Sequence, residues 1–234
     1  MIMKNGTIIT IENLIKRFPI GGGEFTALNG INLSFEKGEF AGIVGPSGSG
    51  KTTMLNILGS LDNPTVGLTN VLGTTSKNMT PRLAATLRKK HIGFIFQTYN
   101  LMPVYTVYEN VEFPLLLLKM PASERKKAVL NSIEWVGLSD KIKSKPPQLS
   151  GGESQRVAIA RAMVKKPDLV LADEPTANLD AENSHHILQT MERLNKELET
   201  TFVFATHDDK VIGYLRRIIK LEDGKVVSDK NITK

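Results

Sequence analysis

The sequence lacks several features that would place it in a special class of protein. It has no cysteine, which leaves no disulfide framework and fits a reducing compartment without requiring one. No apolar run approaches the roughly 20 residues of a membrane-spanning helix, and the run Pro114–Leu118 is closed by Lys119. Met1–Thr10 shows no secretory-signal pattern. We therefore expect one large cytoplasmic domain, and any membrane span must come from another chain.

A concentrated basic surface is also absent, although the formal net charge is +6. Lysine and arginine occur in short, separate clusters: Lys89–Lys90, Arg125–Lys127, Lys165–Lys166 and Arg216–Arg217. Because no basic run carries interleaved aromatic residues, no specific nucleic-acid binding is expected. Solvated surface explains these clusters most simply, and contact with lipid headgroups is the alternative.

One short motif carries the strongest chemical signal. Residues 45–52, GPSGSGKT, match the phosphate-loop pattern G-x-x-x-x-G-K-[ST] after the apolar run Phe40–Val44, a predicted buried strand. The glycines allow backbone N–H groups to curl around an anion, Lys51 supplies a cation for the β- and γ-phosphates, and Thr52 is placed to bind Mg²⁺. The candidate nucleotide-binding residues are Gly45, Pro46, Ser47, Gly48, Ser49, Gly50, Lys51, Thr52 and Thr53.

Two acidic residues follow a second apolar strand. Leu169–Ala172 predicts this buried strand, and Asp173 and Glu174 come directly after it. Carboxylates at the carboxyl edge of a parallel sheet lie where ligands bind. We therefore expect Asp173 to hold Mg²⁺, directly or through water, and Glu174 to accept the proton of an attacking water.

A second anion-binding helix start is predicted about a hundred residues after Lys51, in the segment LSGGE at residues 149–153. Ser150 is placed to cap a helix that runs to Lys165, and Gly151 and Gly152 let the backbone approach a phosphate. One chain would then hold two phosphate-binding helix ends. That arrangement makes sense if each nucleotide lies between the loop of one copy and the LSGGE segment of another.

With these segments in this order, the chain resembles the ATPase subunit of an ATP-binding cassette (ABC) transporter over essentially its whole length. The resemblance implies ATP and Mg²⁺ as ligands, a homodimer around two nucleotides, and a separate transmembrane permease, with the ATPase peripheral on the cytoplasmic face of the inner membrane. It implies that Gln97 contacts Mg²⁺ and the attacking water and borders the permease, and that His207 contacts the γ-phosphate. It also implies that Phe18 stacks on adenine and that the loop at Asp180 crosses the dimer interface. The nucleotide of the other copy would be bound by Ser150, Gly151, Gly152 and Glu153.

The catalytic assignment is therefore Lys51, Gln97, Glu174 and His207, and the metal assignment is Thr52, Gln97 and Asp173. Some side chains have alternatives: Phe18 is also consistent with a core aromatic, and Phe25 lies nearby across a glycine turn. Trp135 is expected in the core. His185 and His186 are adjacent on a predicted helix, so they do not form an i, i+4 metal pair.

The expected fold class is α/β, a P-loop NTPase with a RecA-like core, an N-terminal antiparallel β-subdomain and an inserted α-helical subdomain. Period-2 apolar spacing at Thr7–Ile11 and Ile31–Phe35 predicts antiparallel strands, completed at Val66–Gly73. Alternating strands and helices imply a parallel sheet wrapped by helices. Predicted helix starts follow Thr80, Thr106, Ser123 and Ser139, and Gly137 is a predicted stop. The predicted subdomains are 1–40 and 64–76 (antiparallel β), 41–63, 77–97 and 158–234 (core), and 98–157 (helical insert).

Within the family, Gln97–Leu118 and Leu171–Asp180 are similar to the branch of lipoprotein-releasing, macrolide-exporting and cell-division ATPases (LolD, MacB and FtsE). Thr52, Glu153 and Ala177 stand where serine, glutamine and glycine are common, and we expect no fused membrane region of the macrolide-exporting type. We expect an ATPase that drives lipoprotein release or drug or peptide export. One alternative is a cell-division ATPase that signals through a permease-like partner without transport. A second alternative acts on nucleic acid or ribosomes, and the single cassette and the lack of a basic arm argue against it.

Overall fold

The computed structural model describes residues 6–232, so the ends of the predicted ranges, 1–5 and 233–234, lie outside the described part. The N-terminal region forms an antiparallel sheet in the order β2-β1-β4-β5, as the period-2 pattern predicts. Its strands are β1 Thr7–Ile20, β2 Gly23–Glu36, β4 Val66–Val71 and β5 Thr74–Thr75. β1 and β2 are longer than predicted, because they continue to a tight turn at Gly21 and Gly22, which both take a positive φ.

The second sheet has six strands in the order β10-β9-β3-β8-β7-β6. These are β3 Phe40–Val44, β6 Ile92–Ile95, β7 Leu169–Asp173, β8 Thr201–Thr206, β9 Arg217–Glu222 and β10 Lys225–Asn231. Every neighbouring pair is parallel except β10 with β9. Because β3, β8 and β7 are adjacent and parallel, the segments after their carboxyl ends meet at one edge of the sheet.

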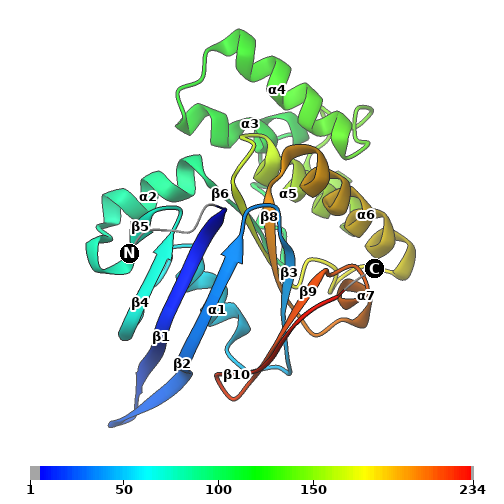
Figure 1. Ribbon diagram of the computed structural model, residues 1–234. Helices are drawn as coiled ribbons and strands as arrows, with labels where there is room; N and C mark the ends of the chain where they lie inside the picture. Colours follow the sequence, from blue (N-terminus) through cyan, green and yellow to red (C-terminus); the bar gives the residue numbers. More distant parts are fainter. Residues whose placement is uncertain (1–5, 233–234) are drawn as a thin grey trace.

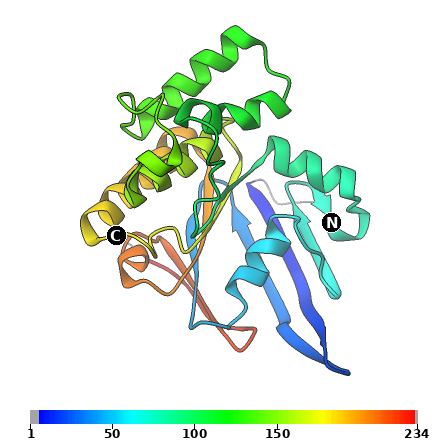
Figure 2. The same ribbon diagram turned by 180° about the vertical axis from the view of Figure 1, so that it is seen from behind.

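Helices cover both faces of this second sheet (Figures 1 and 2). They are α1 Lys51–Leu58, α2 Pro81–Lys90, α3 Val107–Leu117, α4 Ala122–Trp135, α5 Gly151–Met163, α6 Ala181–Leu198 and α7 Asp209–Ile212. α1 shares one core with β1 and β2, while α5 and α6 share the other with α3 and α4, which pack on α5. The two cores lie on opposite faces of the sheet. Because side chains alternate along a strand, Val170 belongs to one core and Leu171 to the other.

Two predicted helix starts are confirmed. The side chain of Thr80 accepts a backbone hydrogen bond at the start of α2, where Pro81 is the first residue. Thr106 and Glu109 form a reciprocal capping box at the start of α3. Gly137, at φ 67°, follows the end of α4, as predicted for a stop.

Two other predicted starts are wrong. α4 begins before Ser123, with Pro121 at its cap, because the proline ring already fixes φ at the value with which the chain enters the helix. No helix follows Ser139 directly. The chain runs on to a single 3₁₀ turn, Pro146–Gln148, whose prolines lack the N–H groups that a longer helix would use. α5 ends at Met163, two residues earlier than predicted.

Candidate nucleotide-binding site

The turn between β3 and α1 is shaped by glycine. Gly50, the cap of α1, takes φ 103°, and Gly48 takes φ 80°, a region that other residues rarely adopt. A Cβ atom on Gly45 would lie 2.0 Å from the carbonyl oxygen of Leu221, so only glycine fits there. The loop is therefore held closely against the end of β9, with its backbone free to curve around an anion.

Lys51, the first residue of α1, is buried and folds back across this loop. Its Nζ donates to the carbonyl oxygens of Gly45 and Pro46, at 2.8 Å each. Ser49 has a buried hydroxyl oxygen with no hydrogen-bond partner among the described residues. Lys51 lines the cavity beside the loop, where its cation suits a phosphate group, whereas Ser49 does not line it.

Thr52 and Asp173 come together although they are far apart in the sequence. The Thr52 hydroxyl donates to Oδ2 of Asp173 at 3.0 Å. Burial raises the pKa of Asp173, and the charge of Glu174 raises it further, while the bond from Thr52 and the charge of Lys51 oppose the shift. A half-buried carboxylate beside a hydroxyl is a donor set of the kind that Mg²⁺ takes from a protein.

Glu174 lies one residue beyond β7, with φ 44° and its N–H bonded to the Ala205 carbonyl at 2.9 Å. Nδ1 of His207 lies 2.6 Å from its Oε1, and the Thr206 hydroxyl donates to its Oε2 at 2.9 Å. Because a carboxylate only accepts, Nδ1 carries the proton in this pair, and Nε2 of a neutral His207 is left as an acceptor. The Glu174 side chain is 12% exposed and that of His207 is 64% exposed, so the imidazole reaches outward from the sheet edge.

These residues line one cavity of about 540 Å³. Its lining includes Ser47, Gly48, Gly50, Lys51, Thr52, Thr53, Gln97, Asp173, Glu174 and His207. Phe18 and Phe25 both lie on its wall, Phe25 being the more exposed, and Lys16 places its Nζ 4.9 Å from the Phe18 ring centroid. Both aromatic candidates for contact with a base therefore remain, on neighbouring strands of the antiparallel sheet.

The LSGGE segment lies outside this cavity. Ser150 caps α5 and shares a capping box with Glu153, whose pKa is lowered mainly by the backbone N–H of Ser150. Gly152 packs so closely against Asn183 of α6 that a Cβ would lie 2.4 Å from the Asn183 side-chain oxygen. None of the residues from Ser150 to Glu153 lines the cavity.

Asp180 is also outside the cavity, as the cap of α6, where its side chain accepts from the Asn183 N–H at 2.8 Å. This bond lowers the pKa of Asp180. Gln97 is exposed and lines the cavity, and its carbonyl accepts from the Asn178 side chain at 3.0 Å. One cavity therefore brings together the phosphate loop, the strand-end acids Asp173 and Glu174, Gln97 and His207. The LSGGE segment and Asp180 lie outside this cavity.

Comparison with known proteins agrees with this geometry. The ABC transporter family model matches residues 28–177. A lipoprotein-releasing system ATP-binding protein LolD from Legionella pneumophila (strain Lens) is 41% identical over 95% of this chain and 98% of its own. The chain belongs to the ABC transporter family.

Other relatives of this ABC ATPase are similar at the same level. LolD from Pseudoalteromonas translucida is 44% identical over 95% of this chain and 96% of its own. A macrolide export ATP-binding/permease protein MacB from Hyphomonas neptunium is 41% identical over 95% of this chain, but only 34% of that longer protein is matched. The dimeric post-hydrolysis structure of the ATP-binding cassette MJ0796, bound to ADP and Pi, is 40% identical, with a TM-score of 0.89 over 97% of this chain and 99% of the other. Within the described residues, no helix is long and apolar enough to cross a membrane.

The site fits the nucleotide that an ABC ATPase hydrolyses. The Lys51 ammonium and the backbone of Gly48 and Gly50, which line the cavity beside Thr52 and Thr53, suit phosphate oxygens. Among the described residues, no group of three His, Cys, Asp or Glu side chains could hold a metal alone. Thr52 and Asp173 offer two oxygen ligands, which suits Mg²⁺ because this ion usually binds one or two protein oxygens together with phosphate and water.

Sequence reasoning missed three residues that organise the site. Thr206 bonds to Glu174, Thr176 donates to Asp208 at 3.0 Å, and Nε2 of Gln155 donates to the Pro175 carbonyl at 2.6 Å. Gln155 ties α5, which begins at the LSGGE segment, to the residues just after Glu174. The sequence indicated only that Gln155 lies in the first turns of a helix that begins at Ser150. It could not indicate the bond to Pro175, because packing brings α5 and the end of β7 together.

Proposed function

We propose that this ABC ATPase works as a homodimer that encloses two ATP molecules, each with Mg²⁺, and drives a separate membrane permease. The observation that carries the proposal is the place of the LSGGE segment. Its capped helix start would be a second phosphate-binding terminus. It does not line the cavity beside the phosphate loop. A second copy, facing the first, would supply this terminus to the open side of each cavity, with the loop at Asp180 crossing between the copies.

Residues of one chain have different roles in hydrolysis. Lys51 and the loop N–H groups bind and orient the β- and γ-phosphates, and Glu174 accepts the proton of the attacking water at its carboxylate. His207 holds Glu174 through Nδ1, and its Nε2, when it also carries a proton, would donate to the γ-phosphate. Thr52, Gln97 and Asp173 would hold Mg²⁺, which would neutralise charge on the phosphates.

The residues of the opposite copy would complete the site. The helix start at Ser150, Gly151, Gly152 and Glu153 would face the γ-phosphate, and the backbone N–H groups of Gly151 and Gly152 would disperse its charge in a loose transition state. Phe18 would stack on adenine, with Phe25 beside it on the cavity wall. Closure of two copies would thus depend on nucleotide, and hydrolysis would reopen them.

The named relatives favour a transport role. LolD proteins belong to a lipoprotein-releasing system and MacB to macrolide export, so we propose lipoprotein release or drug or peptide export as the process driven here. The permease would contact the helical insert near Gln97, which places the ATPase on the cytoplasmic face of the cell membrane as a peripheral subunit.

Affinity capture tests this function. Tagged Glu174→Gln protein with Mg-ATP is incubated with detergent-solubilised native membranes, and an untagged sample serves as the control. Recovery of a permease with few spans and a large external domain is expected, followed by ATP-dependent release of substrate from vesicles that contain the pair. Recovery of ribosomal or DNA-repair proteins alone would overturn the transport function, and a permease that only activates a bound partner would assign the cell-division role.

A further inference from the structure

Glu174 takes a backbone conformation that its place in the sequence disfavours. Its φ of 44° lies in the left-handed region, which residues other than glycine seldom adopt. The next residue is Pro175, whose ring favours extended conformations for the residue before it. A conformation that both effects oppose persists only where the surrounding structure holds it. The contacts around Glu174 and Pro175 must therefore supply this hold.

Hydrogen bonds tie the turn after β7 to two neighbouring elements. From β8, the Ala205 carbonyl accepts from the Glu174 N–H at 2.9 Å. From α5, the Nε2 of Gln155 donates to the Pro175 carbonyl at 2.6 Å. The first bond fixes the peptide group before Glu174, and the second fixes the peptide group after Pro175. Gln155 thus holds the turn on the far side of the disfavoured residue.

The amide of Gln155 is fully buried, and only its nitrogen has a use that the structure shows. Because a carbonyl oxygen only accepts, Nε2 must face Pro175, and the amide oxygen turns away. This Oε1 has no hydrogen-bond partner within residues 6–232. A buried polar atom without a partner is unfavourable. An apolar side chain of the same length would fill the space without that cost, so packing alone does not explain an amide here.

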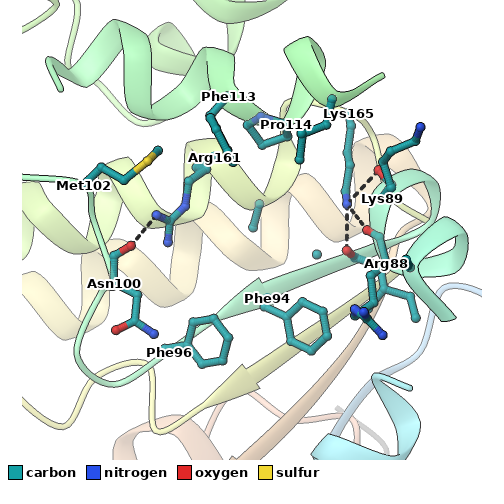
Figure 3. Close-up of a pocket in the computed structure, with 15 residues that line it drawn as sticks. Arg88, Lys89, Phe94, Phe96, Asn100, Met102, Phe113, Pro114, Arg161 and Lys165 are labelled. Carbon is teal, nitrogen blue, oxygen red and sulfur yellow. Dashed lines mark hydrogen bonds between the residues drawn. The ribbon is translucent and has the colours of Figure 1, made fainter. Parts of the chain in front are cut away.

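The same helix also holds the segment that follows Gln97. Arg161 of α5 donates through Nη1 to the Asn100 carbonyl at 2.6 Å and through Nη2 to the Tyr99 carbonyl at 2.7 Å (Figure 3). Arg161 lines a second cavity, of about 570 Å³, which shares no lining residue with the nucleotide cavity. Gln155 lines neither cavity. It can therefore affect hydrolysis only through the residues that it contacts.

We propose that Gln155 is a positioning residue for ATP hydrolysis, which holds Glu174 in its left-handed conformation through the Pro175 carbonyl. The inference rests on the proposed function, in which Glu174 accepts the proton of the attacking water. Without the bond from Gln155, the turn relaxes toward the extended conformation that a following proline favours. That change rotates the carboxylate away from Thr206 and His207. A misplacement of about 1 Å is enough to cost roughly 10²-fold in rate.

The test measures steady-state ATP hydrolysis by Gln155→Met, which keeps the length of the side chain and removes the donor. We expect kcat to fall roughly 10- to 100-fold, with KM for ATP nearly unchanged because Gln155 does not line the nucleotide cavity. An unchanged kcat would overturn the proposal. A raised KM with an unchanged kcat would also overturn it, since that result is expected if Gln155 only places the start of α5.

Thr200→Val is the matched control. The buried Thr200 hydroxyl likewise donates to a proline carbonyl, that of Pro167, at 2.8 Å, but it lies just before β8, at the end of the strand away from Glu174. This variant loses one buried bond of the same kind and should keep its kcat. Thermal unfolding shows that each variant is folded, and Gln155→Leu repeats the measurement if Gln155→Met does not fold.

A second measurement asks whether Gln155 acts through Glu174. In the Glu174→Gln background, Gln155→Met should slow single-turnover hydrolysis of labelled ATP no further, because the base that it positions is already gone. A further fall by the same factor would show an effect independent of Glu174 and overturn the proposal. Near-normal hydrolysis by Glu174→Gln would contradict the proposed function itself. Slow hydrolysis by Glu174→Gln together with normal hydrolysis by Gln155→Met would contradict this inference alone.

Discussion

Glu174 and His207 form a hydrogen-bonded pair at the edge of the parallel sheet, with Oε1 2.6 Å from Nδ1. The second carboxylate oxygen accepts from Thr206 at 2.9 Å, and the Thr206 oxygen accepts from the Asp208 N–H at 3.0 Å. β8 and the residues just after it therefore orient the carboxylate from both sides. The group that accepts a proton in the proposed mechanism is therefore oriented by two side chains of the protein, Thr206 and His207.

Replacing this carboxylate should separate binding from hydrolysis. For Glu174→Gln, ATP binding is expected to persist, because the amide oxygen still accepts a hydrogen bond, while turnover falls by roughly 10²- to 10⁴-fold with loss of the base. Phosphate release and retention of labelled ATP measure the two effects. Glu197→Gln, an exposed change on α6, is the control. Near-normal phosphate release by Glu174→Gln would contradict the role of Glu174.

Thr206 should act as a positioning residue through Glu174. It is fully buried, so Thr206→Val keeps its shape and removes both hydrogen bonds. We expect kcat to fall roughly tenfold, equivalent to about 1.4 kcal/mol, with KM for ATP nearly unchanged, and Thr206→Ser to restore most of the activity. Steady-state kinetics check this, and equal kcat in Thr206→Val and wild-type protein would show that the hydroxyl does not matter.

The two-copy site predicts complementation between inactive variants. Ser150→Asp keeps a good helix cap but places a negative charge toward the phosphates of the other copy, so it should be inactive, whereas Ser150→Asn should retain activity. Lys51→Met should be inactive through its own phosphate loop. In a mixture of Ser150→Asp and Lys51→Met, one intact site forms in each mixed dimer, and ATPase activity is expected to return. A mixture as inactive as its components would argue against sites shared between copies.

Two glycines of the phosphate loop should differ in their tolerance of alanine. At Gly48, a Cβ meets no atom within 4 Å, so Gly48→Ala has only the left-handed backbone penalty of about 1–2 kcal/mol. At Gly45, the Cβ would lie 2.0 Å from the Leu221 carbonyl oxygen, so Gly45→Ala should lose substantially more stability. Urea unfolding without nucleotide measures both variants, and equal midpoints would contradict the close contact with β9.

The capping boxes should make stability depend on acidic pH. Backbone N–H groups of Thr106 and Ser150 lower the pKa of Glu109 and Glu153 below the usual 4.5. Because the folded-state pKa is the lower one, this stabilisation is present above pH 4.5 and is lost as the pH falls through the folded-state pKa. The melting temperature of a Glu109→Ala, Glu153→Ala double variant should lie below that of wild-type protein at pH 7 and approach it near pH 3. A gap that stays constant with pH would rule out this contribution.

Much of the fold followed from local sequence signals. The glycine pattern before Lys51, the capping box at Thr106 and the apolar run before Asp173 each produced the predicted element, because each depends on residues close together in the chain. The helix starts predicted at Ser123 and Ser139 were wrong because they also rested on a local signal alone. A serine is a good helix cap, but the prolines at and after these segments determined where the helices begin.

The sequence by itself determined the family, the phosphate loop, the strand-end acids and the capped start of α5, since these are motifs of a few consecutive residues. Only the tertiary structure decided which of them share a cavity. Packing of β3, β8 and β7 brings Thr52 to Asp173 and Glu174 to His207, and it leaves Ser150 outside. Packing of α5 beside the end of β7 brings Gln155 to the Pro175 carbonyl. Such convergence depends on contacts between distant segments, which the local spacing of residues does not specify.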